Sequence, residues 1–189
     1  MTNANGLAVL RQFLMEYGSI LGLSWTAVFG LYVAGIRTQD GTVLLAAFLG
    51  LFIILGLTFM LGMRAKVRSV QLQVRLSPFF SFVNIFSMFM YASLLCGAME
   101  YAYFQFLDKG ALSGALQTMF ADAELRMAYQ QMGMLETYKQ LREIITEVGT
   151  LSALDKVLLL FNQNFFVGLI VAIPVTITYW FYKPKAAAL

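Results

Sequence analysis

The sequence predicts an all-α integral membrane protein, with four transmembrane helices in a bundle and an amphipathic helical segment between the third and the fourth. Hydrophobic residues make up 60% of the chain and charged residues 12%, which is more apolar than the surface of a soluble domain tolerates. Four apolar runs reach the length of about 20 residues that a helix needs to cross about 30 Å of hydrocarbon. The segment between the last two runs shows apolar side chains at helical spacing.

The first two runs lie close together in the chain. The first covers about residues 17–36, between Glu16 and Arg37, and the second covers about residues 43–63 and contains no charged residue. The residues before the first run lack the short basic start and the small-residue cleavage site of a signal peptide. We therefore expect the first run to stay in the protein as a transmembrane helix.

The third and fourth runs each begin with a helix-start signal. The third covers about residues 79–107 and follows Pro78, which suits the first position of a helix. The fourth covers about residues 153–182 and follows Ser152, which together with Asp155 forms a predicted capping box.

Residues 108–152 are too long for a simple connection and are predicted to form one or two amphipathic helices with a break near Gly133. We expect this segment to lie on the bilayer surface or to pack over the end of the bundle; a coiled-coil-like partner face is the alternative. The apolar positions that suggest the helices are Leu112, Leu116, Met119, Ala123, Met127, Met134, Tyr138, Leu141, Ile145 and Val148.

The basic residues predict the orientation. Residues 64–77, between the second and third runs, contain no acidic residue. Short basic loops stay in the cytoplasm, so alternation places both termini in the cytoplasm and residues 108–152 outside. The basic residues that agree on this orientation are Arg64, Lys66, Arg68 and Arg75 in the connection, Arg11 near the amino terminus, and Lys183 and Lys185 near the carboxyl terminus.

Small residues at every fourth position predict close helix packing, because helices in lipid associate through backbone approach and polar contacts. We expect these rows to form a tight crossing between the first and second helices; the alternative is that glycine is simply frequent in membrane helices. The row in the first helix is Gly18, Gly22, Thr26, Gly30 and Ala34, and the row in the second is Ala46, Gly50, Thr58 and Gly62.

Polar residues of three helices are expected at one membrane boundary. Glu100 lies about 20 residues after the third helix enters the hydrocarbon, beside a belt of aromatic residues. Counting back about 20 residues from the aromatic residues at the inner end of the fourth helix places Asn162 and Asn164 at this level. Arg37, at the outer end of the first helix, lies at a similar depth. We hypothesise an outward-side polar cluster of these four residues; the alternative is that each reaches the head groups independently.

The sequence offers no reaction centre. It contains no histidine and a single cysteine, Cys96, and it shows no glycine-rich phosphate loop, paired catalytic carboxylates, nucleophile elbow or metal-ligand spacing. We therefore predict no catalytic residue, no cofactor and no metal site. Nucleic acid binding has no support, and membrane lipids are the expected surroundings.

The order of features resembles domain-of-unknown-function family 4199, an uncharacterised family of small bacterial inner-membrane proteins that is frequent in Bacteroidota. The resemblance covers nearly the whole chain, and it implies four transmembrane helices in a bacterial inner membrane, without transferring an activity or functional residues. The stretches that carry it are EYGSILGL in the first helix, SPFFSFVNIFSMFMYASLLCGAMEYAYFQFLD, the Met-rich segment with MGMLE, and FNQNFFVGLIVAIP in the fourth.

These observations favour a non-enzymatic interaction or accessory subunit of an envelope complex, which contacts itself or another membrane protein, for example a membrane-bound glycosyltransferase. The first alternative is a small transporter or channel that works as an oligomer. Its path would be lined by Asn84, Glu100, Asn162 and Asn164. A lipid-modifying membrane enzyme is the second alternative.

Overall fold

The computed structural model describes residues 4–74 and 77–181, and within these ranges it contains helices and no strand. The helices are α1 (Ala4–Thr38), α2 (Gly41–Gln71), α3 (Pro78–Ala102), the π-helix η1 (Tyr103–Asp108), α4 (Ala111–Met119), α5 (Ala123–Gln131), α6 (Leu135–Thr150) and α7 (Ala153–Phe181). The predicted all-α membrane fold is confirmed, because four helical stretches in the described ranges are long and apolar enough to cross a membrane.

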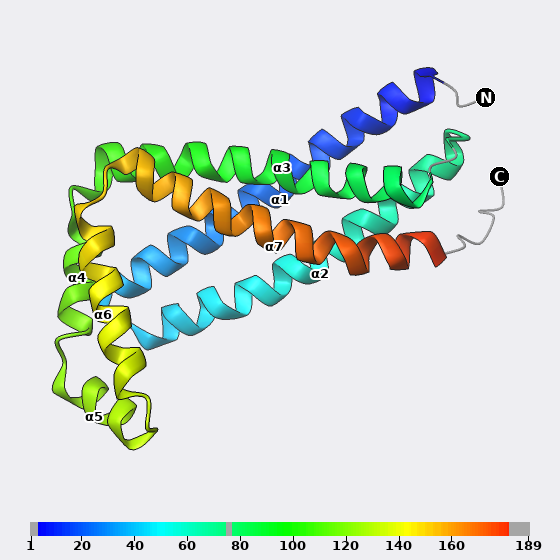
Figure 1. Ribbon diagram of the computed structural model, residues 1–189. Helices are drawn as coiled ribbons and strands as arrows, with labels where there is room; N and C mark the ends of the chain where they lie inside the picture. The colour runs from blue at the N-terminus through cyan, green and yellow to red at the C-terminus, as the bar shows by residue number, and fades with distance from the viewer. Residues whose placement is uncertain (1–3, 75–76, 182–189) are drawn as a thin grey trace.

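The bundle consists of α1, α2, α3 and α7, and α4, α5 and α6 stand across one of its ends (Figure 1). We refer to residues 111–150, which hold these three helices, as the cap. The start of α1, the end of α2, the start of α3 and the end of α7 all lie at the opposite end (Figure 1). We refer to it as the basic end because α2 carries Arg64, Lys66 and Arg68 there.

The first two helices are longer than their apolar runs. The helix α1 begins at Ala4, well before residue 17, and α2 continues through the expected loop of residues 64–77 as far as Gln71. Lysine and arginine favour helices, and their long side chains reach water from a helix that is still within the membrane. Arg75, Tyr182, Lys183 and Lys185 lie outside the described residues.

The cap contains three helices instead of the expected one or two. The expected break is present at Gly133, whose φ of +71° favours glycine. A second break separates α4 from α5, where the Asp122 side chain accepts a hydrogen bond from the amide of Glu124 at 2.8 Å. The sequence alone does not identify Asp122 as a helix cap, because its spacing from Arg126 equally suits an ion pair between residues one helical turn apart.

The small residues of α1 differ in their surroundings: Gly18 and Gly22 pack against α3, whereas Gly30 does not pack against another helix. A Cβ atom on Gly22 would lie 2.8 Å from the carbonyl oxygen of Ala92 in α3, and a Cβ on Gly18 would lie 2.7 Å from Cβ of Tyr91. The expectation that this part of the row packs against the second helix is therefore wrong. Gly30 has no neighbour within 4 Å of a Cβ position.

Helix geometry explains this difference. With about 3.6 residues per turn, every step of four residues turns by about 40° around the helix, so the row winds away from α3. Thr26 donates its hydroxyl to the carbonyl of Gly22 at 2.9 Å, and Ala34 is exposed.

On α2, the small residues also contact different helices. A Cβ on Gly50 would lie 2.7 Å from Val28 of α1, as the expected crossing of the first and second helices requires. A Cβ on Gly62 would lie 2.6 Å from Val175 of α7. Ala46 is exposed. The buried core between the four long helices includes Leu21, Leu61, Ile85, Met88 and Val175.

Candidate functional site

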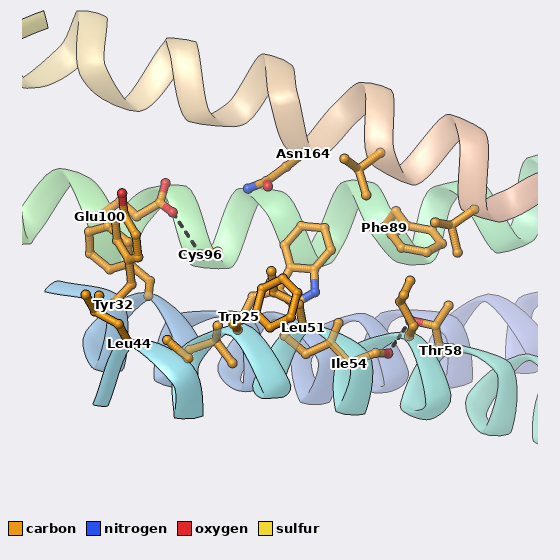
Figure 2. Close-up of a pocket in the computed structure, with 17 residues that line it drawn as sticks. Trp25, Tyr32, Leu44, Leu51, Ile54, Thr58, Phe89, Cys96, Glu100 and Asn164 are labelled. Carbon is orange, nitrogen blue, oxygen red and sulfur yellow. Dashed lines mark hydrogen bonds between the residues drawn. The ribbon is translucent and has the colours of Figure 1, made fainter. Parts of the chain in front are cut away.

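A cavity of about 610 Å³ lies within the bundle, between α2 and α7 (Figure 2). Its walls are mostly apolar, and α1 and α3 close it on the other sides. The residues that matter most for its chemistry are Trp25 and Tyr32 of α1, Leu51 and Thr58 of α2, Cys96 and Glu100 of α3, and Asn164 and Val167 of α7.

The cavity exists because α2 and α7 meet near the basic end only. Gly62 allows the backbone of α2 to approach Val175 closely, and the two helices diverge towards the cap (Figure 1). Several lining side chains on the two diverging helices remain exposed, among them Leu51 and Val167. The cavity is therefore open sideways, towards the hydrocarbon of a bilayer.

Glu100 is the acidic side chain of this cavity and is 4% exposed. Its Oε1 atom accepts a hydrogen bond from the thiol of Cys96 at 3.3 Å (Figure 2). Its Oε2 atom is buried and has no hydrogen-bond partner among the described residues. A buried carboxyl oxygen without a hydrogen-bond donor costs free energy. A donor from a bound molecule would therefore stabilise this atom.

The polar group lies at one end of an elongated space. Figure 2 shows Glu100 near Tyr32 and Leu44, and Thr58 at the opposite end. Leu44 lies near the start of α2, and Thr58 lies 14 positions further along the helix, a distance of about 21 Å. Thr58 donates its hydroxyl to the carbonyl of Ile54 at 2.8 Å, so this hydroxyl proton is not available to a ligand at the end of the cavity opposite Glu100.

The structure brings two of the four residues of the expected polar cluster together. Glu100 and Asn164 line the same cavity, with Asn164 pointing towards it from α7 (Figure 2). Asn162 is exposed, because two residues along a helix turn by about 200°. Arg37 lines a separate groove beside Tyr103. Asn84, which the transporter alternative adds, does not line this cavity.

Asp108 is a structural residue that the sequence analysis did not single out. It is 2% exposed and accepts hydrogen bonds from the Tyr103 hydroxyl at 3.0 Å, the Gly110 amide at 3.2 Å and the Leu112 amide at 2.8 Å. These bonds join the π-helix η1 to the start of α4 and so fix where the cap begins. The signal in the sequence is an aspartate two residues before a glycine, the pattern of a turn before a helix.

Cation–π contacts hold the basic end together. The guanidinium of Arg68 lies 4.4 Å from the centre of the Phe13 ring in α1, and the ammonium of Lys66 lies 5.9 Å from the ring of Trp180 in α7. Two of the cations that predict orientation therefore also connect α2 to its neighbours. These pairs could not be predicted from the sequence, because the two members of each pair are far apart in the chain.

Tyr138 connects the three helices of the cap. Tyr138 of α6 is 4% exposed, donates its hydroxyl to the carbonyl of Phe120, and packs on the rings of Phe120 and Tyr129. The helix α5 has no buried residue. Four large apolar side chains of the cap remain exposed, namely Met127, Met132, Met134 and Ile144.

Four membrane-length helices, a cavity open to lipid and a small cap define a four-helix integral membrane protein. The family described as protein of unknown function (DUF4199) matches residues 16–179, and the chain belongs to this family. The comparison with curated proteins found no match, and neither did the comparison with solved structures. In the part of the chain that the structure describes, no group of three or more cysteine, aspartate or glutamate residues could hold a metal ion.

Proposed function

We propose that this protein is a non-enzymatic interaction subunit of an envelope complex in the bacterial inner membrane, with both termini in the cytoplasm and the cap outside. The observation that carries this proposal is the exposed surface of the cap. The helix α5 buries none of its residues, and exposed methionines lie on it and in the turn that joins it to α6.

Methionine suits a surface that binds another protein. Its side chain is flexible and polarizable and adapts to the shape of a partner. Clusters of exposed apolar side chains on a part of a protein that lies in water are typical of interaction sites. Met127, Met132 and Met134 are 53%, 61% and 43% exposed, and they lie on α5 and in the turn that follows it.

Charge favours a protein partner over the lipid surface. The cap contains five acidic residues, Asp122, Glu124, Glu136, Glu143 and Glu147, and three basic ones, Arg126, Lys139 and Arg142. Helices that lie on anionic lipid carry mainly lysine and arginine on their polar face. A mixture of both signs around methionines resembles the polar rim of a protein interface.

The polar groups of the cavity favour a binding role over a catalytic one. These groups are the carboxyl of Glu100, the thiol of Cys96, the amide of Asn164, the hydroxyls of Tyr32 and Thr58, and the indole N–H of Trp25. A thiol beside a carboxyl could act as a nucleophile and a base only with further groups that stabilise the developing charge, and no lysine, arginine or histidine is among the described residues that line the cavity. We therefore propose that the chain performs no covalent chemistry.

The test is site-specific photocrosslinking in cells that make the protein naturally. A benzophenone amino acid at Met132 is expected to give a discrete protein adduct, with a second chain of this protein or with another envelope protein. The matched control is the same amino acid at Ile53, which is 71% exposed on the lipid-facing side of α2 and is expected to give none. Adducts from neither position, together with a monomeric mass and no partner in native lipid discs, would contradict the proposal.

A further inference from the structure

We propose that the cavity between α2 and α7 binds one hydrocarbon chain of a membrane lipid, and that the head group of this lipid donates a hydrogen bond to Glu100. This binding site is independent of the cap surface that the proposed function uses. Three properties of the cavity point to a lipid: its shape, its sideways opening and the position of its acidic group.

The shape and size of the space suit a hydrocarbon chain. The space is about 610 Å³, within the range of about 300–1,000 Å³ that is usual for small-molecule sites. It is elongated, extending about 21 Å along α2 between Leu44 and Thr58, and a narrow, flexible lipid chain can follow this length.

The sideways opening of the cavity gives access to a ligand that is already in the bilayer. The side chains of Leu51, Leu55 and Val167 line the cavity and are 51%, 39% and 47% exposed, so they form the rim through which the cavity meets hydrocarbon. A lipid chain crosses this rim without leaving an apolar environment, and it fills a space that would otherwise lack dispersion contacts.

Glu100 selects the head group. Its Oε2 atom is buried without a donor at the end of the cavity nearest the cap, where the head group of an outer-leaflet lipid would lie. A head group with an N–H or O–H donor satisfies this oxygen, and a head group that carries only acceptors does not. The Asn164 amide lines the same cavity and offers a second donor and acceptor.

The required chemistry is therefore an apolar chain joined to a hydrogen-bond donor, either an ammonium or a hydroxyl group. Phosphatidylethanolamine supplies the ammonium and phosphatidylglycerol supplies the hydroxyl. Phosphatidylcholine has the same chains but no such donor, and so it serves as the matched control lipid.

The tryptophans give a direct readout. The chain contains two, and Trp25 lines the cavity whereas Trp180 lies near the basic end of α7. In the variant Trp180→Phe, Trp25 is the only tryptophan. Its fluorescence is measured in phosphatidylcholine vesicles that contain a small fraction of lipid with brominated acyl chains, which quench tryptophan on contact.

We expect brominated phosphatidylethanolamine, brominated phosphatidylglycerol or both to quench Trp25 with a preference of about tenfold over brominated phosphatidylcholine, the size expected for a hydrogen bond to a carboxyl group. Glu100→Met should abolish this preference. Glu100→Gln, which keeps an acceptor oxygen but no charge, should weaken the preference for the ammonium lipid more than that for the hydroxyl lipid.

Two further variants test the location. Val167→Phe fills the cavity from its exposed rim and should reduce the quenching, whereas Val83→Phe, on an exposed site of α3 that does not line the cavity, should not. Equal quenching by all three lipids, or a preference that survives both Glu100→Met and Val167→Phe, would overturn the proposal. Helical content by circular dichroism confirms that each variant is folded.

Discussion

The thiol of Cys96 lies one helical turn before Glu100 on α3 and donates a hydrogen bond to its Oε1 atom at 3.3 Å. This bond fixes the carboxyl group within the cavity, because both residues are buried and one of the two carboxyl oxygens is held. The single cysteine of the chain therefore has a positioning role.

Replacing Cys96 tests this role. Cys96→Ala removes the donor and leaves both carboxyl oxygens of Glu100 without a partner, so we expect a loss of about 1–2 kcal/mol in the free energy of unfolding. Cys96→Ser keeps a donor of similar size and should lose less. Unfolding in lipid discs is followed by circular dichroism. Equal stability of the alanine variant and the natural protein would show that the bond contributes nothing.

Two glycines of the same row on α1 are expected to respond in opposite ways. In Gly22→Ala the new Cβ meets the Ala92 carbonyl oxygen at 2.8 Å, so α1 and α3 must separate and the melting temperature should fall. In Gly30→Ala the Cβ meets nothing within 4 Å, and the better helix propensity of alanine should stabilise by up to about 1 kcal/mol. Thermal unfolding of the two variants checks this, and equal shifts would refute the assigned contact of α1 with α3.

Asp108 should control the attachment of the cap. Asp108→Ala removes the acceptor of three hydrogen bonds, including those from the Leu112 amide and the Tyr103 hydroxyl. We expect amide hydrogen exchange to accelerate at the start of α4, with a loss of about 2 kcal/mol or more. Tyr103→Phe removes one of the three bonds and is the milder comparison. Unchanged exchange in α4 would argue against this capping role.

The turn between α1 and α2 should depend on pH. The Thr42 hydroxyl donates to Oδ1 of Asp40 at 2.6 Å and the Thr42 amide at 2.8 Å, and these hydrogen bonds hold the pKa of Asp40 below its ordinary value. A lowered pKa in the folded state means that the ionised group stabilises the fold above its unfolded pKa. This stabilisation is lost as the pH falls through the folded-state pKa.

The measurement is denaturant unfolding at a series of pH values, on the natural protein and on Asp40→Asn. The asparagine keeps a capping oxygen but does not titrate in this range. We expect a small acid-dependent loss of stability in the natural protein that is absent from the variant, small because Asp40 is exposed. Identical pH profiles of the two proteins would count against the assigned hydrogen bonds.

Much of the fold could be predicted because membranes constrain sequences strongly. A helix must satisfy its own backbone in lipid, so length and apolarity alone indicate the four long helices. The capping pair at the start of α7 was equally readable, and the structure shows the Asp155 amide donating to Ser152 Oγ at 3.2 Å. These features depend on local sequence only.

Rotation around the helix axes could not be predicted in the same way. A row of small residues shows that some helix approaches, but it does not identify which one, and Gly22 contacts α3 instead of α2. The same ambiguity separates Asn164 from Asn162: both lie at a similar depth, and only Asn164 lines the cavity. Depth follows from counting residues, whereas direction follows from tertiary packing.

Labelling of single cysteines from each side of the membrane determines the orientation of the bundle, and the cavity meets lipid only if the cap and the basic end lie on opposite faces. In a Cys96→Ser background, cysteine is placed at the exposed Met127 of the cap or at the exposed Arg64 of α2. We expect a membrane-impermeant maleimide to label Met127→Cys in intact spheroplasts and to label Arg64→Cys only after the membrane is opened. Labelling of both from the outside, or of Arg64→Cys alone, would contradict this orientation.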